Sequence, residues 1–488
     1  MDSYKAEKVD VSSGDAGAVK GLAFKGGKAL FLRHLSGFAV NFTGGIVLAR
    51  LLGPEVLGLY FISYTVFVIL RQFIDLGIGV HIIRLPSNPS PAEYKSAFTL
   101  QQAAALAACF FTAFVVSPSA ASWYGHEEIG LLIASAAAGG YFSSWQSLPL
   151  SKLEREMDYK KVGLIEFVEV LVFNASAVIL AWKGAGVAGL AVGNLLRGLV
   201  PALMALWLGG LTPGFSKDRA SMASVIRGAS PVLGINLSIW VIMAAPPVLV
   251  GKLSGPKALG IAQLAYSLMS STMFVSSIFQ RVGLTSLAKF QDDPVRFNKA
   301  VKGMVQLLFI IYIPLTMGVA SLSPWWAPFI YGSEWAGMDG VILIAALPLT
   351  AVALLTVFLS ALLSKGHASL VLKQSILHAV IYWTVMALTA SSLGALSVPV
   401  THTAAMTAGC LFIYGYSKYC GPFDYAPLAA GFLSGAAIMA ISWFSAKAGY
   451  VFVPFILWPA FAGLYILFSV SARETVAMFM NSLRGELR

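Results

Sequence analysis

Long apolar runs separated by short polar connections dominate this sequence. Each run is close to the roughly 20 residues that an α-helix needs to cross a bilayer. The runs are continuous, whereas the strands of a membrane barrel alternate between apolar and polar positions in short segments. The pattern therefore predicts an all-α, polytopic membrane protein. The fourteen predicted spans are 30–52, 56–78, 97–117, 128–149, 162–182, 186–208, 230–251, 258–280, 303–322, 339–363, 368–390, 396–416, 426–445 and 449–470.

The composition supports insertion into a membrane and excludes a single soluble core. The chain has 488 residues, of which 58% are hydrophobic and 11% are charged, whereas a soluble domain carries about 25% charged residues. The net charge of +11 comes from Lys and Arg in short connections between apolar runs, so we expect no nucleic-acid partner. Residues 1–28 are polar and lack the apolar core of a signal peptide, and we expect them to form a disordered cytoplasmic tail.

One short motif occurs twice in the chain. The pattern Leu-x-Gly-Pro-x-x-Leu-Gly spans residues 51–58 and again residues 253–260, an offset of 202 residues. Gly just past a helix end supplies a left-handed cap, and Pro fits the first turn of the next helix. Each copy therefore predicts a hairpin between two membrane helices, and the pair predicts an internal duplication; the alternative is a common turn that recurs by chance. The structural residues of the two hairpins are Gly53, Pro54, Gly58, Gly255, Pro256 and Gly260.

The distribution of basic residues predicts the orientation in the membrane. If both termini are cytoplasmic, and Arg33 and Arg50 near the ends of the first span are counted with the adjoining connections, 25 of the 33 Lys and Arg residues are cytoplasmic and five are outside. The remaining three, Arg71, Arg197 and Lys373, lie within spans. Such a bias favours cytoplasmic termini and an even number of spans. Two halves of six spans each then share one orientation, as parallel transporter repeats do. The predicted segments are a cytoplasmic tail (1–28), an N-terminal six-helix lobe (29–210), a cytoplasmic linker (211–229), a C-terminal six-helix lobe (230–420), an additional helix pair (421–470) and a cytoplasmic tail (471–488).

A family resemblance rests on residues 48–60, followed by Asp75-Leu76-Gly77 and Arg84. The string Leu-Ala-Arg-Leu-Leu-Gly-Pro-Glu-Val-Leu-Gly-Leu-Tyr at 48–60 is its most specific part. Here the chain resembles the Wzx-type polysaccharide and oligosaccharide flippases of the multidrug/oligosaccharidyl-lipid/polysaccharide exporter superfamily. The close resemblance covers about residues 30–85. It implies two six-helix bundles around a central cavity that opens alternately to either side of the membrane.

The resemblance also implies a function. The substrate would be a polyprenyl-pyrophosphate-linked oligosaccharide, moved across the bacterial inner membrane for surface polysaccharide or exopolysaccharide biosynthesis. The implied partners are membrane lipids, a polysaccharide polymerase and a chain-length regulator. The nearest alternative is an ion-coupled multidrug exporter of the same superfamily. A membrane glycan polymerase or ligase usually needs a sizeable outer loop, which the sequence does not predict, and a structural membrane scaffold leaves charged residues inside the spans unexplained.

Cations inside the spans are the candidates for a substrate-binding, cationic cavity. Arg binds phosphate through a planar fork of donors, and ionisable residues in membrane spans usually face a cavity. Arg197 lies near the middle of the span 186–208 with Asn194 one turn away on the same face. The alternative for Arg197 is a structural role in which it caps carbonyls between helices.

Three further cations complete this set, and each has an ordinary alternative. Arg71 precedes Asp75 by four residues, so the two can form a self-neutralised pair on one helix. Arg33 lies near the inner end of its span and is alternatively an anchor at the cytoplasmic surface. Lys373 lies about five residues into its span and can extend to the interface.

Ionisable groups that can carry a coupling ion form the second set of candidates. Asp75, Glu166, Glu169 and His378 are candidates for H⁺ or Na⁺ coupling. The alternative for the two glutamates is pairing with a nearby lysine, Lys160 or Lys161.

Motifs typical of soluble enzymes are missing from the sequence. Leu22 stands where a phosphate-binding loop ending at Gly26-Gly27-Lys28 needs its first glycine. We therefore expect a transporter with no catalytic residue, no metal site and no cofactor. The driving energy is then an ion gradient or the removal of product on the far side.

Overall fold

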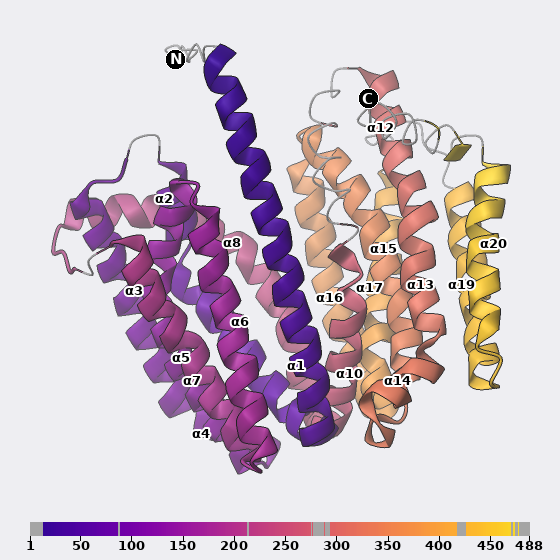
Figure 1. Ribbon diagram of the computed structural model, residues 1–488, viewed down its shortest axis with the longest axis horizontal. Helices are drawn as coiled ribbons and strands as arrows, with labels where there is room; N and C mark the ends of the chain where they lie inside the picture. Colours follow the sequence, from indigo (N-terminus) through magenta and orange to yellow (C-terminus); the bar gives the residue numbers. More distant parts are fainter. Residues whose placement is uncertain are drawn as a thin grey trace. The chain divides into compact units, whose positions relative to one another are not determined.

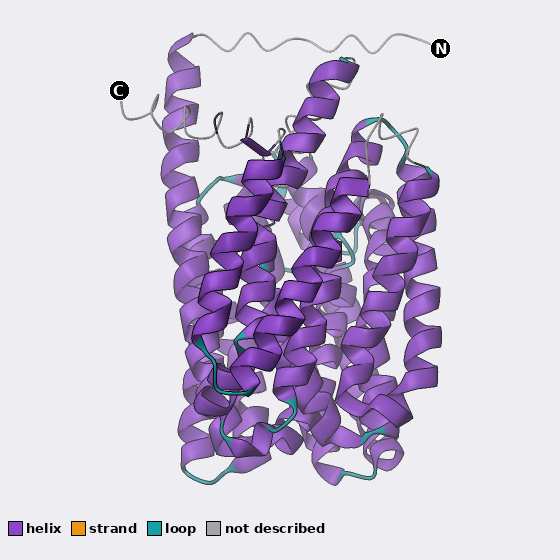
Figure 2. Ribbon diagram, turned by 90° about the vertical axis from the view of Figure 1, so that its right-hand side faces the viewer, coloured by secondary structure: helices purple, strands orange, loops and turns teal. Residues whose placement is uncertain are grey.

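The structure is a computed structural model in which every regular element of the described residues is a helix (Figure 1, Figure 2). The predicted all-α fold is therefore confirmed. The described residues are 13–85, 88–211, 214–274, 276, 287, 293–416, 426–469, 472, 473 and 477. Side chains are described from residue 36 onward, except at 228–239, 426, 427 and 468 within helices.

The described part of the chain forms two compact units. The first unit comprises the described residues of Met1–Leu51 together with Val66–Asn236. Its helices α3, α5, α6 and α7 run side by side (Figure 1). The elements that build it are α1 (Ser13–Asp75), α2 (Ile78–Arg84), α3 (Pro91–Phe111), η1 (Thr112–Val116), α4 (Ser117–Tyr124), α5 (Glu127–Arg155), α6 (Tyr159–Trp182), α7 (Gly186–Gly209) and the first part of α8 (Arg219–Ala245).

The second unit comprises Leu52–Thr65 and the described residues of Leu237–Arg488. Helices α15, α16 and α17 pack on one another, and α13 packs on α19 and α20. The elements after α8 are η2 (Pro246–Val250), α9 (Gly251–Leu253), α10 (Gly255–Ser270), α12 (Pro294–Leu307), η3 (Leu308–Tyr312), α13 (Ile313–Ser321), α14 (Ser323–Tyr331), η4 (Ser333–Trp335), α15 (Met338–Ser364), α16 (Ala368–Leu393), η5 (Gly394–Leu396), α17 (Ser397–Gly415), α19 (Ala426–Lys447) and α20 (Phe452–Phe468).

Many of these helices have the length and composition of membrane spans. Within the described residues, eight helices are long and apolar enough to cross a membrane, and two shorter apolar helices cover Trp240–Leu253 and Phe452–Leu467. The protein is therefore a multi-pass membrane protein. The number of fourteen spans stays a prediction, because two pairs of adjacent predicted spans merge into the helices Ser36–Asp75 and Ala368–Gly415, and the span 258–280 reaches beyond the described residues.

The first hairpin motif shows why two predicted spans merge. A single assignment, α1, covers both 30–52 and 56–78, but Gly53 inside it has φ 72° and ψ 176°, which is not helical. Two helices therefore meet at Gly53, with Pro54 directly after it. Gly255 of the second motif also has a positive φ, of 84°. Glycine adopts this conformation without the steric cost that other residues incur.

The two hairpin motifs cross closely within the second unit. A Cβ atom added at Gly58 would lie 1.8 Å from the backbone oxygen of Pro256. A Cβ added at Gly260 would lie 1.9 Å from the backbone oxygen of Pro54. The contact is reciprocal, since each motif places its last glycine against the proline of the other. Glycine at both positions allows the two backbones to approach this closely.

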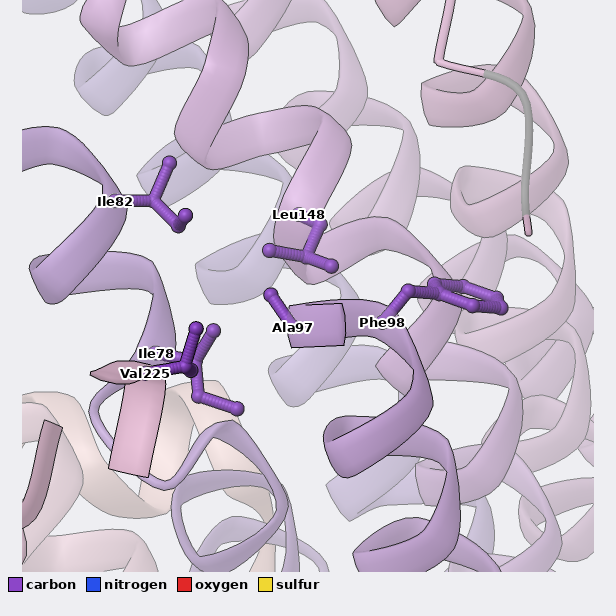
Figure 3. Close-up of a cluster of buried hydrophobic side chains, with 6 residues drawn as sticks. All are labelled: Ile78, Ile82, Ala97, Phe98, Leu148 and Val225. Carbon is purple, nitrogen blue, oxygen red and sulfur yellow. The ribbon is translucent and has the colours of Figure 1, made fainter. Parts of the chain in front are cut away.

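A small apolar core joins helices α2, α3, α5 and α8 of the first unit. Ile78 and Ile82 of α2 pack against Phe98 of α3, Leu148 of α5 and Val225 of α8 (Figure 3). This core fixes α2 against α5 directly after Asp75. It therefore helps to position the residues of the candidate site.

Helices α5 and α7 approach each other through glycines. A Cβ at Gly139 of α5 would lie 2.2 Å from the backbone oxygen of Asn194, and one at Gly198 of α7 would lie 2.0 Å from the oxygen of Gly139. Small residues allow membrane helices to pack this tightly. The side chain of Asn194 is buried and donates to Ser135 Oγ at 3.3 Å, so its observed contact holds α7 to α5.

Three π-helical turns, η1, η2 and η3, interrupt the helices at or just before prolines. Pro118 follows η1 by two residues, Pro246 and Pro247 lie in η2, and Pro314 follows η3 by two residues. Proline lacks the N–H that a regular helix uses, and a π-turn is one way in which a helix accommodates such a residue. Pro246 and Pro247 lie inside the predicted span 230–251, and there the helix is locally widened.

Candidate functional site

Three ionised side chains from three helices meet inside the first unit. Arg71 Nη1 of α1 donates to Glu169 Oε1 of α6 at 2.6 Å. Arg197 Nε of α7 lies 3.5 Å from the same oxygen. The other oxygen of Glu169 accepts from Gln146 Nε2 of α5 at 3.2 Å. Four helices thus converge on one carboxylate.

The charge balance explains why this cluster is stable within apolar helices. Glu169 is buried, and a buried charge is tolerated where it is paired and hydrogen-bonded. Two guanidinium groups share one carboxylate, so the network of Arg71, Glu169 and Arg197 carries a net formal charge of +1. A cluster with one surplus positive charge is suited to attract an anion.

The two arginines differ in their surroundings. The guanidinium carbon of Arg197 lies 4.6 Å from the ring centre of Phe67 and 5.3 Å from that of Phe173, so cation–π contacts add to its ion pair. Its side chain is 14% exposed, whereas that of Arg71 is 38% exposed. Arg71 is therefore the more accessible cation, and Arg197 is held on three sides.

A cleft lies beside Arg71, and through it a ligand can reach the guanidinium group. This α1–α6 cleft has a volume of about 410 Å³ and is lined by Gly37, Phe38, Asn41, Arg71, Glu166, Phe167, Glu169 and Val170. Asn41 Oδ1 at its edge accepts from Asn174 Nδ2 at 3.0 Å. The cleft therefore exposes one guanidinium between two carboxylates and an amide.

The structure separates Arg71 from the partner that its spacing predicts. Asp75 accepts from Ser147 Oγ at 2.7 Å, while Arg71 pairs with Glu169. Lys161, an alternative partner for the glutamates, pairs with Asp158 at 3.0 Å. Arg33 lies in α1, but its side chain is outside the described residues.

In the second unit, His378 belongs to a cluster of rings, and Lys373 does not. The rings of His378 and Tyr382 stack at 5.7 Å with an interplanar angle of 15°. His402 of α17 meets His378 edge-on at 5.4 Å, and its Nδ1 contacts the Tyr266 hydroxyl of α10. Lys373 is exposed on α16 while His378 is buried, so these two candidates do not form one polar surface.

Sequence reasoning missed several residues of the site. Gln146, Phe67 and Phe173 contact the charged cluster, and their residue types gave no signal within apolar runs. Tyr266 and Tyr382 were missed as partners of the histidines, although a Tyr hydroxyl inside a span needs a hydrogen-bond partner. Among the described residues, no group of three His, Cys, Asp or Glu side chains could hold a metal ion.

Comparisons with known proteins give the context for this geometry. A model of the family described as polysaccharide biosynthesis protein matches residues 47–339. The lipopolysaccharide biosynthesis protein WzxC of Escherichia coli strain K12 is 22% identical over 294 residues, which cover 59% of this chain and 59% of that protein. The chain thus spans less than two thirds of the length of this relative.

Two solved structures share the fold. The lipid II flippase MurJ in an inward closed conformation matches with a TM-score of 0.65 and 13% identity, over 94% of this chain and 99% of that one. A multidrug resistance MATE family transporter in an inward-facing conformation matches with a TM-score of 0.61 and 16% identity, over 78% and 94%. At these identities the likeness concerns the fold.

Proposed function

Because the chain belongs to the polysaccharide biosynthesis protein family, we propose that it is a flippase. Its substrate is a polyprenyl-pyrophosphate-linked oligosaccharide, which it moves across the bacterial inner membrane by alternating access. The observation that carries this proposal is the cluster of Arg71, Glu169 and Arg197 in apolar helices of a member of this family. Charged groups inside membrane spans usually mark the path of a polar substrate.

In this proposal the two arginines have different roles. Arg71 is accessible from the α1–α6 cleft and binds a phosphate oxygen of the substrate. Arg197 is a positioning residue, since it holds Glu169 and is itself fixed by Phe67 and Phe173. An incoming phosphate competes with Glu169 for Arg71, so binding loosens the ion pair that joins α1 to α6. The substrate can in this way bias the packing of these helices.

The same cluster offers a route for ion coupling. Two guanidinium groups favour the ionised form of Glu169, so a coupling proton would reach Glu169 only after Arg71 has moved to the phosphate. Glu166 and Asp75 line clefts that Arg71 also lines, and they are further sites for H⁺ or Na⁺. We propose that the termini are cytoplasmic, that no other cofactor is required, and that a polysaccharide polymerase and a chain-length regulator act beside the flippase.

A multidrug exporter is the second candidate, because the fold resembles that of a multidrug transporter as well. That candidate predicts that the membrane carboxylates are needed and that the arginines are dispensable. A drug-efflux assay that compares Arg197→Ala with Glu166→Gln separates the two. Efflux that requires Glu166 and not Arg197 favours the exporter.

In a strain of the native host from which the gene has been deleted, we expect the wild-type gene to restore surface polysaccharide. At equal membrane abundance, Arg71→Ala should restore less than a tenth of the wild-type amount of polysaccharide. The physical reason is the loss of the accessible cation, so Arg71→Lys should recover part of the signal because it keeps the charge. Lys183→Ala, in the exposed turn after α6, is the matched control and should export normally. Lipid-linked precursors are measured in the same cells.

Two outcomes would count against this account. Normal polysaccharide export and a normal distribution of precursors in the strain without the gene would overturn the flippase function. Full export by Arg71→Ala would leave the function standing and remove Arg71 from the binding site.

A further inference from the structure

Most of the residues that line a second cleft in the first unit carry a hydroxyl, amide or carboxylate group. It has a volume of about 340 Å³, and its polar wall includes Asp75, Gln101, Ser143, Gln146, Ser147 and Glu166. We call it the hydroxyl-lined cleft. Pockets that take small molecules are typically about 300–1,000 Å³, so this cleft offers far more room than one or two bridging waters need.

Several polar atoms of this wall are buried without a partner in the described part of the chain. Both amide atoms of Gln101, the hydroxyl of Ser143 and the carbonyl oxygen of Gln146 have no hydrogen bond there. These three residues are 0%, 2% and 1% exposed. Buried polar groups are nearly always hydrogen-bonded, because a buried donor or acceptor without a hydrogen bond lowers the stability of the protein. Their concentration along one cleft indicates that a bound molecule supplies the missing bonds.

The neighbouring Gln102 shows that the lack of hydrogen-bond partners is specific to the residues of this cleft. Gln102 donates from Nε2 to Ser144 Oγ at 3.0 Å, and its Oε1 lies 3.2 Å from the same hydroxyl. Gln102 is buried as well, so burial by itself does not leave a glutamine of α3 unsatisfied. Gln101 and Gln102 are therefore a matched pair, one satisfied by the protein and one not.

The unsatisfied groups select the chemistry of the ligand. They include donors, the Gln101 amide N–H and the Ser143 hydroxyl, and acceptors, the oxygens of Gln101 and Gln146. A metal cation takes acceptors alone, whereas a sugar hydroxyl both donates and accepts, as serine does. The lining also holds three carboxylates, Asp75, Glu154 and Glu166, and its single guanidinium, Arg71, is already assigned to the phosphate, which disfavours a second anion in this cleft.

We propose that the hydroxyl-lined cleft binds an uncharged sugar ring of the transported head group through Gln101, Ser143 and Gln146. This inference rests on the proposed flippase function and adds the class of sugar that the site accepts. Arg71 lines this cleft and also the α1–α6 cleft. A phosphate at Arg71 and a sugar in the hydroxyl-lined cleft can therefore belong to one substrate.

The test compares Gln101→Leu with Gln102→Leu in the purified full-length protein and in cells. We expect Gln101→Leu to keep or raise the midpoint of thermal unfolding, because it removes unsatisfied groups, while polysaccharide export falls at least tenfold at equal abundance. Gln102→Leu should lower the midpoint, because it removes the hydrogen bond between Gln102 and Ser144. Ser143→Ala is a second, smaller change and should reduce export with an unchanged midpoint.

Sugar binding is measured on the purified protein by the shift of the unfolding midpoint. The probes are glucose, galactose, mannose and N-acetylglucosamine, with glucuronate as the anionic probe and sodium chloride against potassium chloride as the cation probe. We expect at least one neutral sugar to raise the midpoint of the wild type, with at least tenfold weaker affinity in Gln101→Leu and no shift with glucuronate.

Two outcomes overturn the proposal, and a third separates it from the flippase function. A sodium-specific shift that Gln101→Leu abolishes would assign the cleft to a cation. No shift with any probe, together with full export by Gln101→Leu and Ser143→Ala, would mean that water alone fills it. If the wild type fails to restore export but binds a neutral sugar through Gln101, the flippase function fails while the binding site stands.

Discussion

Replacing Glu169 by alanine is expected to lower the free energy of unfolding by roughly 3–5 kcal/mol and to abolish export. The change removes the carboxylate that pairs with Arg71 and Arg197 and leaves two cations within apolar helices. Removing one partner of a buried ion pair typically costs this much, because the other charge stays buried and uncompensated. Thermal or denaturant unfolding of the purified protein measures the loss.

The matched control for this variant is Glu156→Ala. Glu156 is exposed and lies 3.8 Å from Lys152, and such surface pairs contribute only about 0–1 kcal/mol. A double variant, Glu169→Ala with Arg197→Met, should recover part of the loss, because it removes one of the stranded cations. Equal unfolding free energies for Glu169→Ala and Glu156→Ala would mean that the three-residue cluster contributes nothing.

We expect Gly58→Ala to destabilise the protein by more than about 3 kcal/mol, beyond the 1–3 kcal/mol typical of overpacking. The added Cβ would lie 1.8 Å from the backbone oxygen of Pro256. A flexible side chain could move aside, but a backbone carbonyl within a helical segment cannot do so without displacing the hairpin. Gly260→Ala should have the same effect, because its Cβ would meet the oxygen of Pro54 at 1.9 Å.

Gly303→Ala in α12 is the control for these two variants. Within the described structure, nothing lies within 4 Å of a Cβ at this position, and Ala is favoured over Gly inside a helix by roughly 0.5–1 kcal/mol. The unfolding midpoint of Gly303→Ala should therefore rise slightly. A Gly58→Ala protein as stable as the wild type would show that the two hairpins do not cross as described.

The sequence predicts the fold class well because the physical cause is local. A run of about 20 apolar residues is suited to a membrane helix wherever the rest of the chain lies. The same holds for the hairpins, since a glycine between two helical runs favours a positive φ, and Gly53 and Gly255 both have one. Locally encoded features of this kind need no knowledge of tertiary packing.

The candidate site depends on contacts between distant residues, so the sequence predicts it less well. The spacing of Arg71 and Asp75 allows an i,i+4 pair, but Glu169 lies 98 residues away in sequence and forms the ion pair instead. Helix packing, which no spacing reveals, decides between these two carboxylates. Gln101 and Gln102 make the same point, since they are adjacent and identical in type, yet only Gln102 meets a hydroxyl.

The π-helical turns have a mechanical consequence. A regular helix resists bending because its backbone hydrogen bonds must stretch together on one side. At η1, η2 and η3 the regular bonding pattern is already interrupted beside a proline, so less elastic resistance remains at these three places. Each affected helix is therefore more easily bent at one fixed position, and the helical segments on either side of that position are stiffer. A force that bends one of these helices would bend it at the π-helical turn and leave the regular segments straight.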